Sequence, residues 1–161
     1  MEELLKEFRQ TVEASSQRLL LISEEQSGSP RAPGKWSPKQ IIGHLIDSAS
    51  NNHQRFVRAQ FSDDLTFAGY DQEAWVRVQD YDKEEWALLV QLWKYYNLHL
   101  LHVMAAVPEK SLARPRHRHN LDQIAWKGVP QNEPVTLLYF MRDYVAHLKN
   151  HLNQIFSDSN L

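Results

Sequence analysis

The chain has 161 residues and a mass of 18.9 kDa. That length suits one domain around one apolar core, and we expect residues 1–161 to form a single domain. The 18 Lys and Arg residues against 20 Asp and Glu residues give a formal net charge of −2, which argues against binding to nucleic acid or to an anionic membrane surface. A small molecule is the partner that this composition favours.

Two absences narrow the location and the chemistry of the protein. No apolar run reaches the roughly 18 residues that cross a membrane, and the acidic start Met1-Glu2-Glu3 lacks the basic segment of a secretory signal, so we expect a cytoplasmic protein. The chain contains no Cys, which excludes disulfides, thiolate metal sites and a cysteine nucleophile. Any metal site must use His, Asp or Glu side chains.

The spacing of apolar residues predicts amphipathic helices. The first covers about residues 2–26 and ends at residues 27–34, where two Gly and two Pro break the helix. The second begins with Ser37 as the N-cap, Pro38 at the first helical position and Gln40 as the capping-box partner, and it continues to about residue 60.

Two more helices follow. The third begins at a capping pair of Asp82 and Glu85 and ends near Pro108. The fourth opens at Pro134 and carries apolar residues at helical spacing as far as Ile155. Four long amphipathic helices predict an all-α protein, a four-helix bundle.

Long connections join the second helix to the third and the third to the fourth. The first connection, residues 61–80, is rich in aromatic residues, and we expect it to pack across the bundle. The second, residues 109–133, is polar and long for a structureless loop. Its length indicates either a functional role or a short local hairpin.

A pair of histidines in the fourth helix suggests a metal site. His147 and His151 stand four residues apart, so their rings leave one helix face roughly 5–6 Å apart and can bind one divalent metal ion. The chain has 8 His, so a bare pair at this spacing arises often by chance and needs a third ligand. Asp143, one turn earlier, is a candidate to orient His147 through a hydrogen bond, although a solvated surface acid is the commoner outcome.

The spacing alone leaves the third ligand open. His44 lies away from the apolar centre of the second helix, which favours a solvent-accessible cleft between the second and fourth helices over a site inside the core. Three protein ligands in such a cleft leave a position for water or substrate, as in catalytic metal sites. His53, His99 and His102 are alternatives, for which a polar flank or a hydrogen-bonded core imidazole is the commoner role. Ligands that are all His admit zinc, nickel, iron or manganese.

The stretch GKWSPKQIIGHLIDS at residues 34–48, followed by the His147-x-x-x-His151 pair, resembles the DinB-like family. The helix order, the Trp-Ser start of the second helix, the His within that helix and the paired His of the fourth all agree with the family pattern over nearly the whole chain. The segment YDQEAW at residues 70–75 also resembles what members carry between their second and third helices.

The resemblance implies a four-helix bundle in which His44, His147 and His151 hold one divalent metal ion, with zinc or nickel first among the candidates. Family members include S-transferases that use bacillithiol or another low-molecular-weight thiol, and proteins described as metal-dependent hydrolases. We therefore expect a metal-dependent enzyme that activates either water or an external thiol by lowering its pKa. Because the chain has no Cys, a thiol cosubstrate would have to supply any thiolate.

Five further residues are candidates for binding substrate or cosubstrate. Arg114, Arg116 and Arg118 could bind the carboxylates of such a thiol, although a solvated basic loop is the commoner role. Asn51 and Arg55 share the side of the second helix that carries His44, so they are candidates for the wall of the cleft.

Other functions and an oligomer stay open. A stress-related protein that binds metal or a small ligand without turnover fits the same residues, since no paired carboxylates or Ser-His-Asp set requires catalysis. Nucleic-acid binding through the Arg-rich stretch ranks last because the net charge is negative. The many aromatic residues are compatible with a homodimer.

Overall fold

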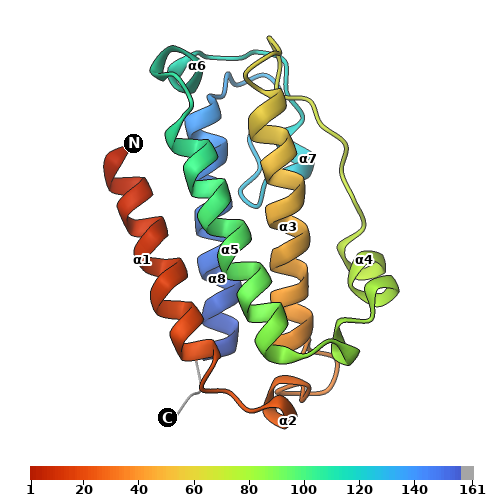
Figure 1. Cartoon of the computed structure of the whole chain (residues 1–161). Coiled ribbons are helices and arrows are strands. Elements are labelled where there is room, and N and C mark those ends of the chain that lie inside the picture. Colours follow the sequence, from red (N-terminus) through yellow and green to blue (C-terminus); the bar gives the residue numbers. More distant parts are fainter. Residues whose placement is uncertain (157–161) are drawn as a thin grey trace.

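Four long helices make up the body of the protein, whose computed structural model is shown in Figure 1 and describes residues 1–156. They are α1 (Glu2–Leu19), α3 (Pro38–Arg58), α5 (Trp86–Ala105) and α8 (Leu137–Phe156). The short helices are α2 (Glu24–Ser27), α4 (Gln72–Gln79), η1 (Tyr81–Lys83), α6 (Glu109–Ala113) and α7 (Leu121–Ile124). Within residues 1–156 extended pairing is limited to two isolated bridges. The predicted all-α four-helix bundle is confirmed; residues 157–161 of the predicted domain lie outside the described part.

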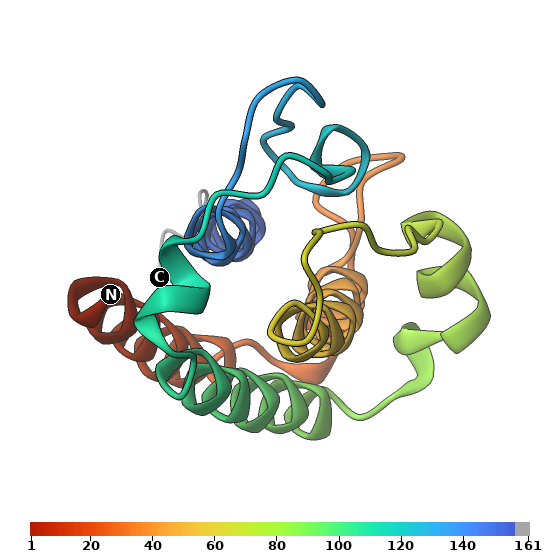
Figure 2. The same ribbon diagram turned by 90° about the horizontal axis from the view of Figure 1, so that it is seen from above.

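The direction of the helices explains the long connections. In Figure 1, α1 and α8 run downward, whereas α3 and α5 both run upward. Figure 2 shows α5 between α1 and α3, with α8 facing them across the core. Because α3 and α5 run the same way, the chain must return along the whole bundle between them, and residues 59–85 form this crossover.

The first predicted helix is interrupted. We expected one helix over residues 2–26, and this is wrong, since α1 ends at Leu19. Ser23 then adopts an extended backbone and starts α2, with its Oγ accepting a hydrogen bond from the Gln26 N–H at 3.2 Å and its own N–H donating to Gln26 Oε1 at 3.0 Å. This local capping box competes with continuation of the helix.

The predicted start of α3 is confirmed in detail. Ser37 Oγ accepts from the Gln40 N–H at 3.2 Å, and Gln40 Oε1 accepts from the Ser37 N–H at 2.9 Å. Asp82 also belongs to this junction, because it accepts from Ser37 Oγ at 2.9 Å and from Gln40 Nε2 at 3.0 Å. The predicted capping pair of Asp82 and Glu85 is therefore wrong, and Glu85 precedes α5 without a side-chain cap.

A buried lysine ties α2, α3 and α5 together. Lys39, 4% exposed, binds the carboxylate of Glu24 and donates to the carbonyl oxygens of Asp82 and Glu84 at 3.2 and 2.6 Å. The other Glu24 oxygen accepts from the first N–H of α5, that of Trp86, at 2.9 Å. Charge-assisted hydrogen bonds of this kind fix the first turns of α3, on which the site depends.

The two connections are ordered by distant partners. The crossover packs along α3 and buries Leu65 and Val76. Of the local hairpin considered for residues 109–133, the structure shows one isolated antiparallel bridge, between Arg116 and Val135, while His119 pairs with Leu65 of the crossover.

The start of the fourth helix was also predicted wrongly. Instead of beginning at Pro134, α8 begins at Leu137. Thr136 precedes it, and its Oγ1 accepts a hydrogen bond from the Tyr139 N–H at 3.1 Å. A threonine cap thus replaces the proline start.

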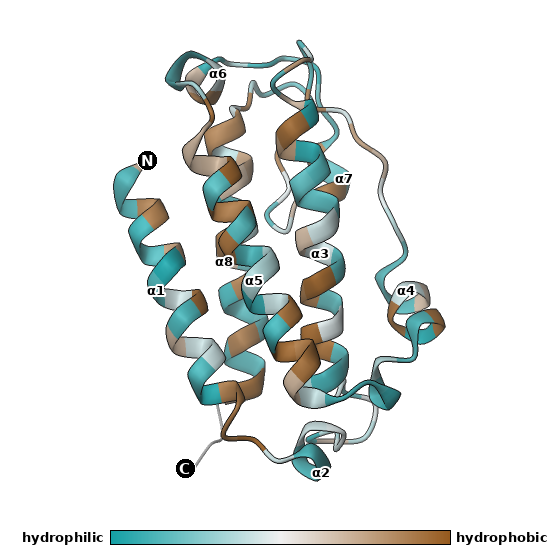
Figure 3. Ribbon diagram, viewed as in Figure 1, coloured by the Kyte–Doolittle hydropathy of each residue, from teal (hydrophilic) through white to brown (hydrophobic). Residues whose placement is uncertain are grey.

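The core lies between the four long helices, whose bands of apolar and polar residues appear in Figure 3. Aromatic side chains pack within it, with Phe56 edge-on to both Phe140 and Tyr144 at ring separations of 5.7 and 5.9 Å. Edge-to-face pairs of this kind add to the stabilisation from burial. In the part of the chain that the structure describes, no helix combines the length and apolarity needed to cross a membrane.

Candidate metal centre and its pocket

Three histidine rings meet between the second turn of α3 and the last turns of α8. His44 faces His147 and His151 across the two helices, with ring centroids 5.2 and 4.8 Å away, and the two α8 rings are 4.6 Å apart. One potential ligand atom from each ring lies within 4.8 Å of the others. Among residues 1–156 this is the single group of three or more His, Asp or Glu side chains that is close enough to hold one metal ion.

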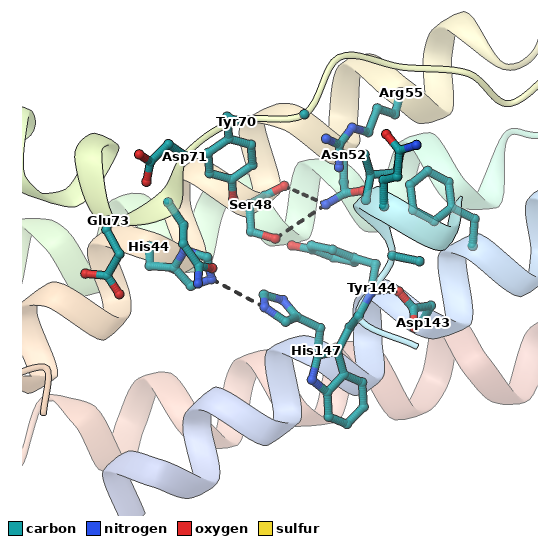
Figure 4. Close-up of a pocket in the computed structure, with 17 residues that line it drawn as sticks. His44, Ser48, Asn52, Arg55, Tyr70, Asp71, Glu73, Asp143, Tyr144 and His147 are labelled. Carbon is teal, nitrogen blue, oxygen red and sulfur yellow. Dashed lines mark hydrogen bonds between the residues drawn. The ribbon is translucent and has the colours of Figure 1, made fainter. Parts of the chain in front are cut away.

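The spacing of the nitrogens fits a cation. His44 Nε2 lies 3.3 Å from His147 Nε2, shown by a dashed line in Figure 4. Two nitrogens bound to a tetrahedral zinc ion at about 2.0–2.1 Å stand roughly 3.3–3.4 Å apart. His151 Nδ1 lies 3.1 Å from Gln154 Oε1, which leaves its Nε2 for a ligand. An all-imidazole donor set with this separation suits a divalent transition-metal ion.

Burial keeps the three rings in the form that binds metal. His44 is 1% exposed, and this burial, together with the nearby charges of His151 and His147, lowers its pKa to about 3. Burial and the charge of His151 lower the pKa of His147 to about 4. Burial also lowers the pKa of His151. Neutral imidazoles at physiological pH offer lone pairs, which metal binding requires.

A glycine next to His44 sets how closely α3 approaches the crossover. A Cβ atom on Gly43 would lie 2.1 Å from Cδ2 of Tyr81. The Tyr81 ring is buried, and its hydroxyl donates to Asp47 Oδ1 at 2.8 Å. Movement of the ring would cost that bond, so a side chain at position 43 would strain the contact between α3 and the crossover.

Two tryptophans flank the group. The Trp36 ring lies 5.2 Å from the His44 ring and stacks at 6.4 Å on that of His151. The Trp126 ring lies 6.5 Å from that of His147. Aromatic rings thus border the three histidines on two sides.

A pocket of about 560 Å³ opens beside His44 and His147. Its walls come from α3, the stretch at residues 69–73, the α7 segment and α8, and Figure 4 draws the side chains that line it. His151 is not among these and lies next to Trp36. The pocket brings a ligand to two of the three histidines, and its volume lies in the range typical of small-molecule sites.

A row of polar groups on α3 forms one wall of the pocket. Ser48, Asn52 and Arg55 follow His44 at successive turns and are all buried. Asn52 Nδ2 donates to the Ser48 carbonyl at 2.9 Å, while its Oδ1 is buried without a partner. Such an acceptor costs about 1–3 kcal/mol of stability. Across the pocket, burial raises the pKa of Tyr70 to about 12, so its hydroxyl stays protonated.

Asp143 does not contact His147 in the way that the sequence suggested. Its two oxygens accept the backbone N–H groups of Trp126 and Lys127, each at 2.8 Å. Burial raises the pKa of this carboxyl group, while the two N–H groups oppose that effect. The carboxylate thus holds the 126–127 backbone over the pocket, and it is not a solvated surface acid.

The arginine stretch lies away from this pocket, and none of the three guanidinium groups lines it. Arg116 is 2% exposed and donates to carbonyl oxygens of the Ser111, Arg114 and Ala59 backbone at 3.1–3.2 Å. Arg114 binds Asp63, and Arg118 lies 3.8 Å from an oxygen of Asp64. These contacts hold the two long connections together.

The structure separates the remaining candidates. Arg55 lines the pocket, as expected for a cleft wall, whereas Asn51 donates to the Asp47 carbonyl at 2.9 Å and does not line it. His53, His99 and His102 form a second cluster of rings, on α3 and α5, apart from the three converging histidines.

Several pocket residues were not singled out from the sequence. Ser48 and Asn52 repeat the position of His44 at steps of four, a signal that the sequence does carry. Trp126 lies in a connection outside the helices, and Glu73 lies in the first turn of α4, a short helix that the apolar spacing did not predict. Local spacing therefore gives no indication of their positions.

Sequence comparison places the chain among known relatives. A model of the DinB superfamily matches residues 6–155. A Bacillus subtilis (strain 168) protein named "Putative metal-dependent hydrolase YfiT" is 28% identical over 80 residues, which are 50% of this chain and 41% of that protein. A Bacillus mycoides (strain KBAB4) protein of the same description is 29% identical over 59 residues, 37% of this chain and 34% of the relative. The matched part thus spans less than half the length of these relatives.

Structure comparison supports the same fold. The solved structure of YfiT from Bacillus subtilis, described as an unusual four-helix bundle topology, aligns with a TM-score of 0.76 at 18% identity. The alignment covers 97% of this chain and 83% of the YfiT chain.

Proposed function

The chain belongs to the DinB superfamily, and on that premise we propose that His44, His147 and His151 bind one divalent metal ion, zinc or nickel first, in a metal-dependent hydrolase of small molecules. The observation that supports this most is the 3.3 Å separation of two neutral imidazole nitrogens at the wall of a 560 Å³ pocket. The names of the relatives agree with it.

The pocket supplies groups for hydrolysis. A bound divalent ion would lower the pKa of water, or of an external thiol, toward neutrality. Glu73 is exposed and its carboxylate lies on the His44 side of the pocket in Figure 4, so it is our candidate for accepting the proton of the attacking group. Tyr70, which keeps its proton, is our candidate for donating a hydrogen bond to the substrate oxygen.

Transfer of an external thiol is the second reaction that these residues support. The pocket has room for a cosubstrate and a substrate, and the chain has no Cys of its own. The same proton acceptor would serve, because both reactions begin with deprotonation of a small nucleophile.

A panel of reactions on metal-loaded protein tests the proposal. Ester and amide hydrolysis are measured beside conjugation of an aromatic halide with several low-molecular-weight thiols, each with and without a chelator. We expect hydrolysis that chelation abolishes and metal restores, and we expect Glu73→Gln to lower kcat about a hundredfold. Glu25→Gln, a change at another exposed glutamate outside the pocket, is the matched control.

The other outcomes of the panel would assign a different function. Conjugation without hydrolysis would assign the protein to thiol transfer. Metal-loaded protein that turns over neither class while still binding small ligands would instead identify a binding protein without catalysis.

A further inference from the structure

Arg55 is a buried cation whose charge is not paired by the protein. It is 6% exposed and lines the pocket. Among residues 1–156 its one hydrogen bond is donated by Nη2 to the Ala68 carbonyl at 2.9 Å. Within residues 1–156 no carboxylate forms an ion pair with Arg55. A guanidinium carries five N–H donors, so most of its donors are available to a ligand.

Arg116 shows that this arrangement is not a general property of buried arginines in this fold. Arg116 is also buried, but its two terminal nitrogens donate to three backbone carbonyl oxygens and it does not line this pocket. Arg55 has one such acceptor and lies against open space of the pocket. Compared with Arg116, Arg55 therefore has more N–H donors available to an anionic group in the pocket.

Asn52, one turn before Arg55, adds a second unsatisfied atom. Its Oδ1 is buried and has no hydrogen-bond partner, and the side chain is 7% exposed. The amide orientation is fixed, because Nδ2 faces the Ser48 carbonyl, which can only accept a hydrogen bond. Figure 4 shows both side chains at the end of the pocket away from His44. An acceptor and a cation therefore lie on one helix face, three residues apart.

From these contacts we propose that Arg55 and Asn52 bind a carboxylate group of the substrate that carries a neighbouring O–H or N–H, as in an α-hydroxy or α-amino acid. The carboxylate accepts from Arg55, and the neighbouring donor reaches Asn52 Oδ1. This assignment rests on the proposed function, since it places the reacting group at the three histidines.

The length of the substrate follows from the helix. His44 and Arg55 are eleven positions apart, which at about 1.5 Å per residue separates their Cα atoms by roughly 16 Å along α3. The arginine side chain leans toward the N-terminus of the helix, so its head lies on the order of 10 Å from the histidines. The substrate then bears its carboxylate on the order of 10 Å from the bond that reacts.

The charges around the pocket favour a carboxylate over a phosphate. Asp71, Glu73 and Asp143 also line the pocket and oppose a dianion. A fully ionised phosphate monoester offers Asn52 Oδ1 only acceptor oxygens, whereas an α-hydroxyl or α-amino group gives it a donor.

Titration of the metal-free protein with small probes, followed by amide chemical shifts, tests the subsite apart from the metal. The probes are lactate, propionate without the hydroxyl, methyl lactate without the charge, and inorganic phosphate. We expect lactate to shift the amide resonances of residues 52–55 and to bind about tenfold more tightly than propionate. Lactate should also bind more tightly than methyl lactate and phosphate. Tighter binding of phosphate, or lactate shifts elsewhere on the protein, would overturn the proposal.

Substitutions provide the second arm. Arg55→Gln should weaken lactate binding at least tenfold, while Arg58→Gln, at the exposed arginine one turn on, should leave it unchanged. Arg55→Lys keeps the charge and replaces Arg55→Gln in this test if that variant does not fold. It should bind lactate more weakly than wild type does, but more tightly than it binds methyl lactate. Equal lactate affinity in wild type and the folded Arg55 variants contradicts the assignment. Because no metal is present, this result is independent of whether the protein hydrolyses anything.

Discussion

Two groups of histidines lie at opposite faces of α3 and differ in the convergence of their nitrogens and in their exposure to solvent. His44 and His53 are nine residues apart, or about two and a half turns, so they leave the helix in opposite directions. The inner group of His44, His147 and His151 is compact, and two of its nitrogens are 3.3 Å apart. In the outer group His53 lies 5.2 Å from the ring of His99, which lies 6.4 Å from that of His102.

The comparison separates proximity from a binding site. Rings of both groups are neighbours, yet only in the inner group do donor atoms converge under burial that keeps the imidazoles neutral. In the outer group His99 and His102 are exposed to solvent. Convergence of lone pairs next to a pocket, more than the number of histidines, points to a metal site.

The largest effect expected from the comparison is the loss of folding stability at acidic pH. His44 and His147 have pKa values of about 3 and about 4 in the folded protein, against about 6.5 when unfolded, so protons bind preferentially to the unfolded chain. Their contribution to stability is complete above about pH 6.5 and is lost as the pH falls toward 4. Between pH 7.5 and 5 we expect metal-free protein to lose about 2 kcal/mol for each of these two residues, or about 4 kcal/mol from the pair. Urea unfolding at each pH measures it.

A variant assigns that loss to the inner group. His147→Asn should reduce the pH-dependent loss by about 2 kcal/mol, because the titrating ring of His147 is gone. A loss as large as in wild type would show that other groups carry the acid sensitivity.

A methyl group beside His44 is expected to have a smaller effect. Gly43→Ala places a Cβ 2.1 Å from the buried Tyr81 ring, so α3 or the ring must shift, at a cost of about 1–3 kcal/mol. Gly28→Ala is the matched control, since its Cβ would meet nothing nearer than 3.9 Å and its φ is −84°. Denaturant melts should place Gly43→Ala well below wild type and Gly28→Ala within about 0.5 kcal/mol of it. Equal midpoints for the two variants would mean that α3 adjusts freely next to His44.

The smallest effect on stability is expected for substitutions in the outer group of histidines. His99→Ala and His102→Ala remove exposed side chains and should change stability by less than about 0.5 kcal/mol, with metal content unchanged. Elemental analysis of the purified variants checks the second point. A fall in metal content with either variant would move the site to the outer face.

The sequence predicted features that depend on local spacing. The Ser37–Gln40 capping box and the common face of His147 and His151 are set within one or two turns, where helix geometry alone decides. The convergence of His44 with His147, 103 positions apart, could not be derived from spacing and was expected only through the family resemblance.

Two errors, at the end of the first helix and the start of the fourth, came from local caps at Ser23 and Thr136. The others came from polar side chains whose partners are distant in sequence. Asp82 binds the start of α3 in place of its own helix, Asp143 binds the backbone at residues 126–127 in place of His147, and Arg116 is enclosed by carbonyl groups. Each of these side chains gains more from a buried partner brought by the fold than from its neighbours in the chain.

Metal content tests the central claim most directly. Wild type, His44→Ala, His147→Ala and His151→Ala, with His53→Ala as the control from the opposite face of α3, are dialysed against zinc or nickel and then against metal-free buffer, and bound metal is counted per chain. The account predicts one metal ion per chain in wild type and His53→Ala, and loss of that ion in each of the other three. Metal retained after the loss of His44, or lost only with His53, would contradict it.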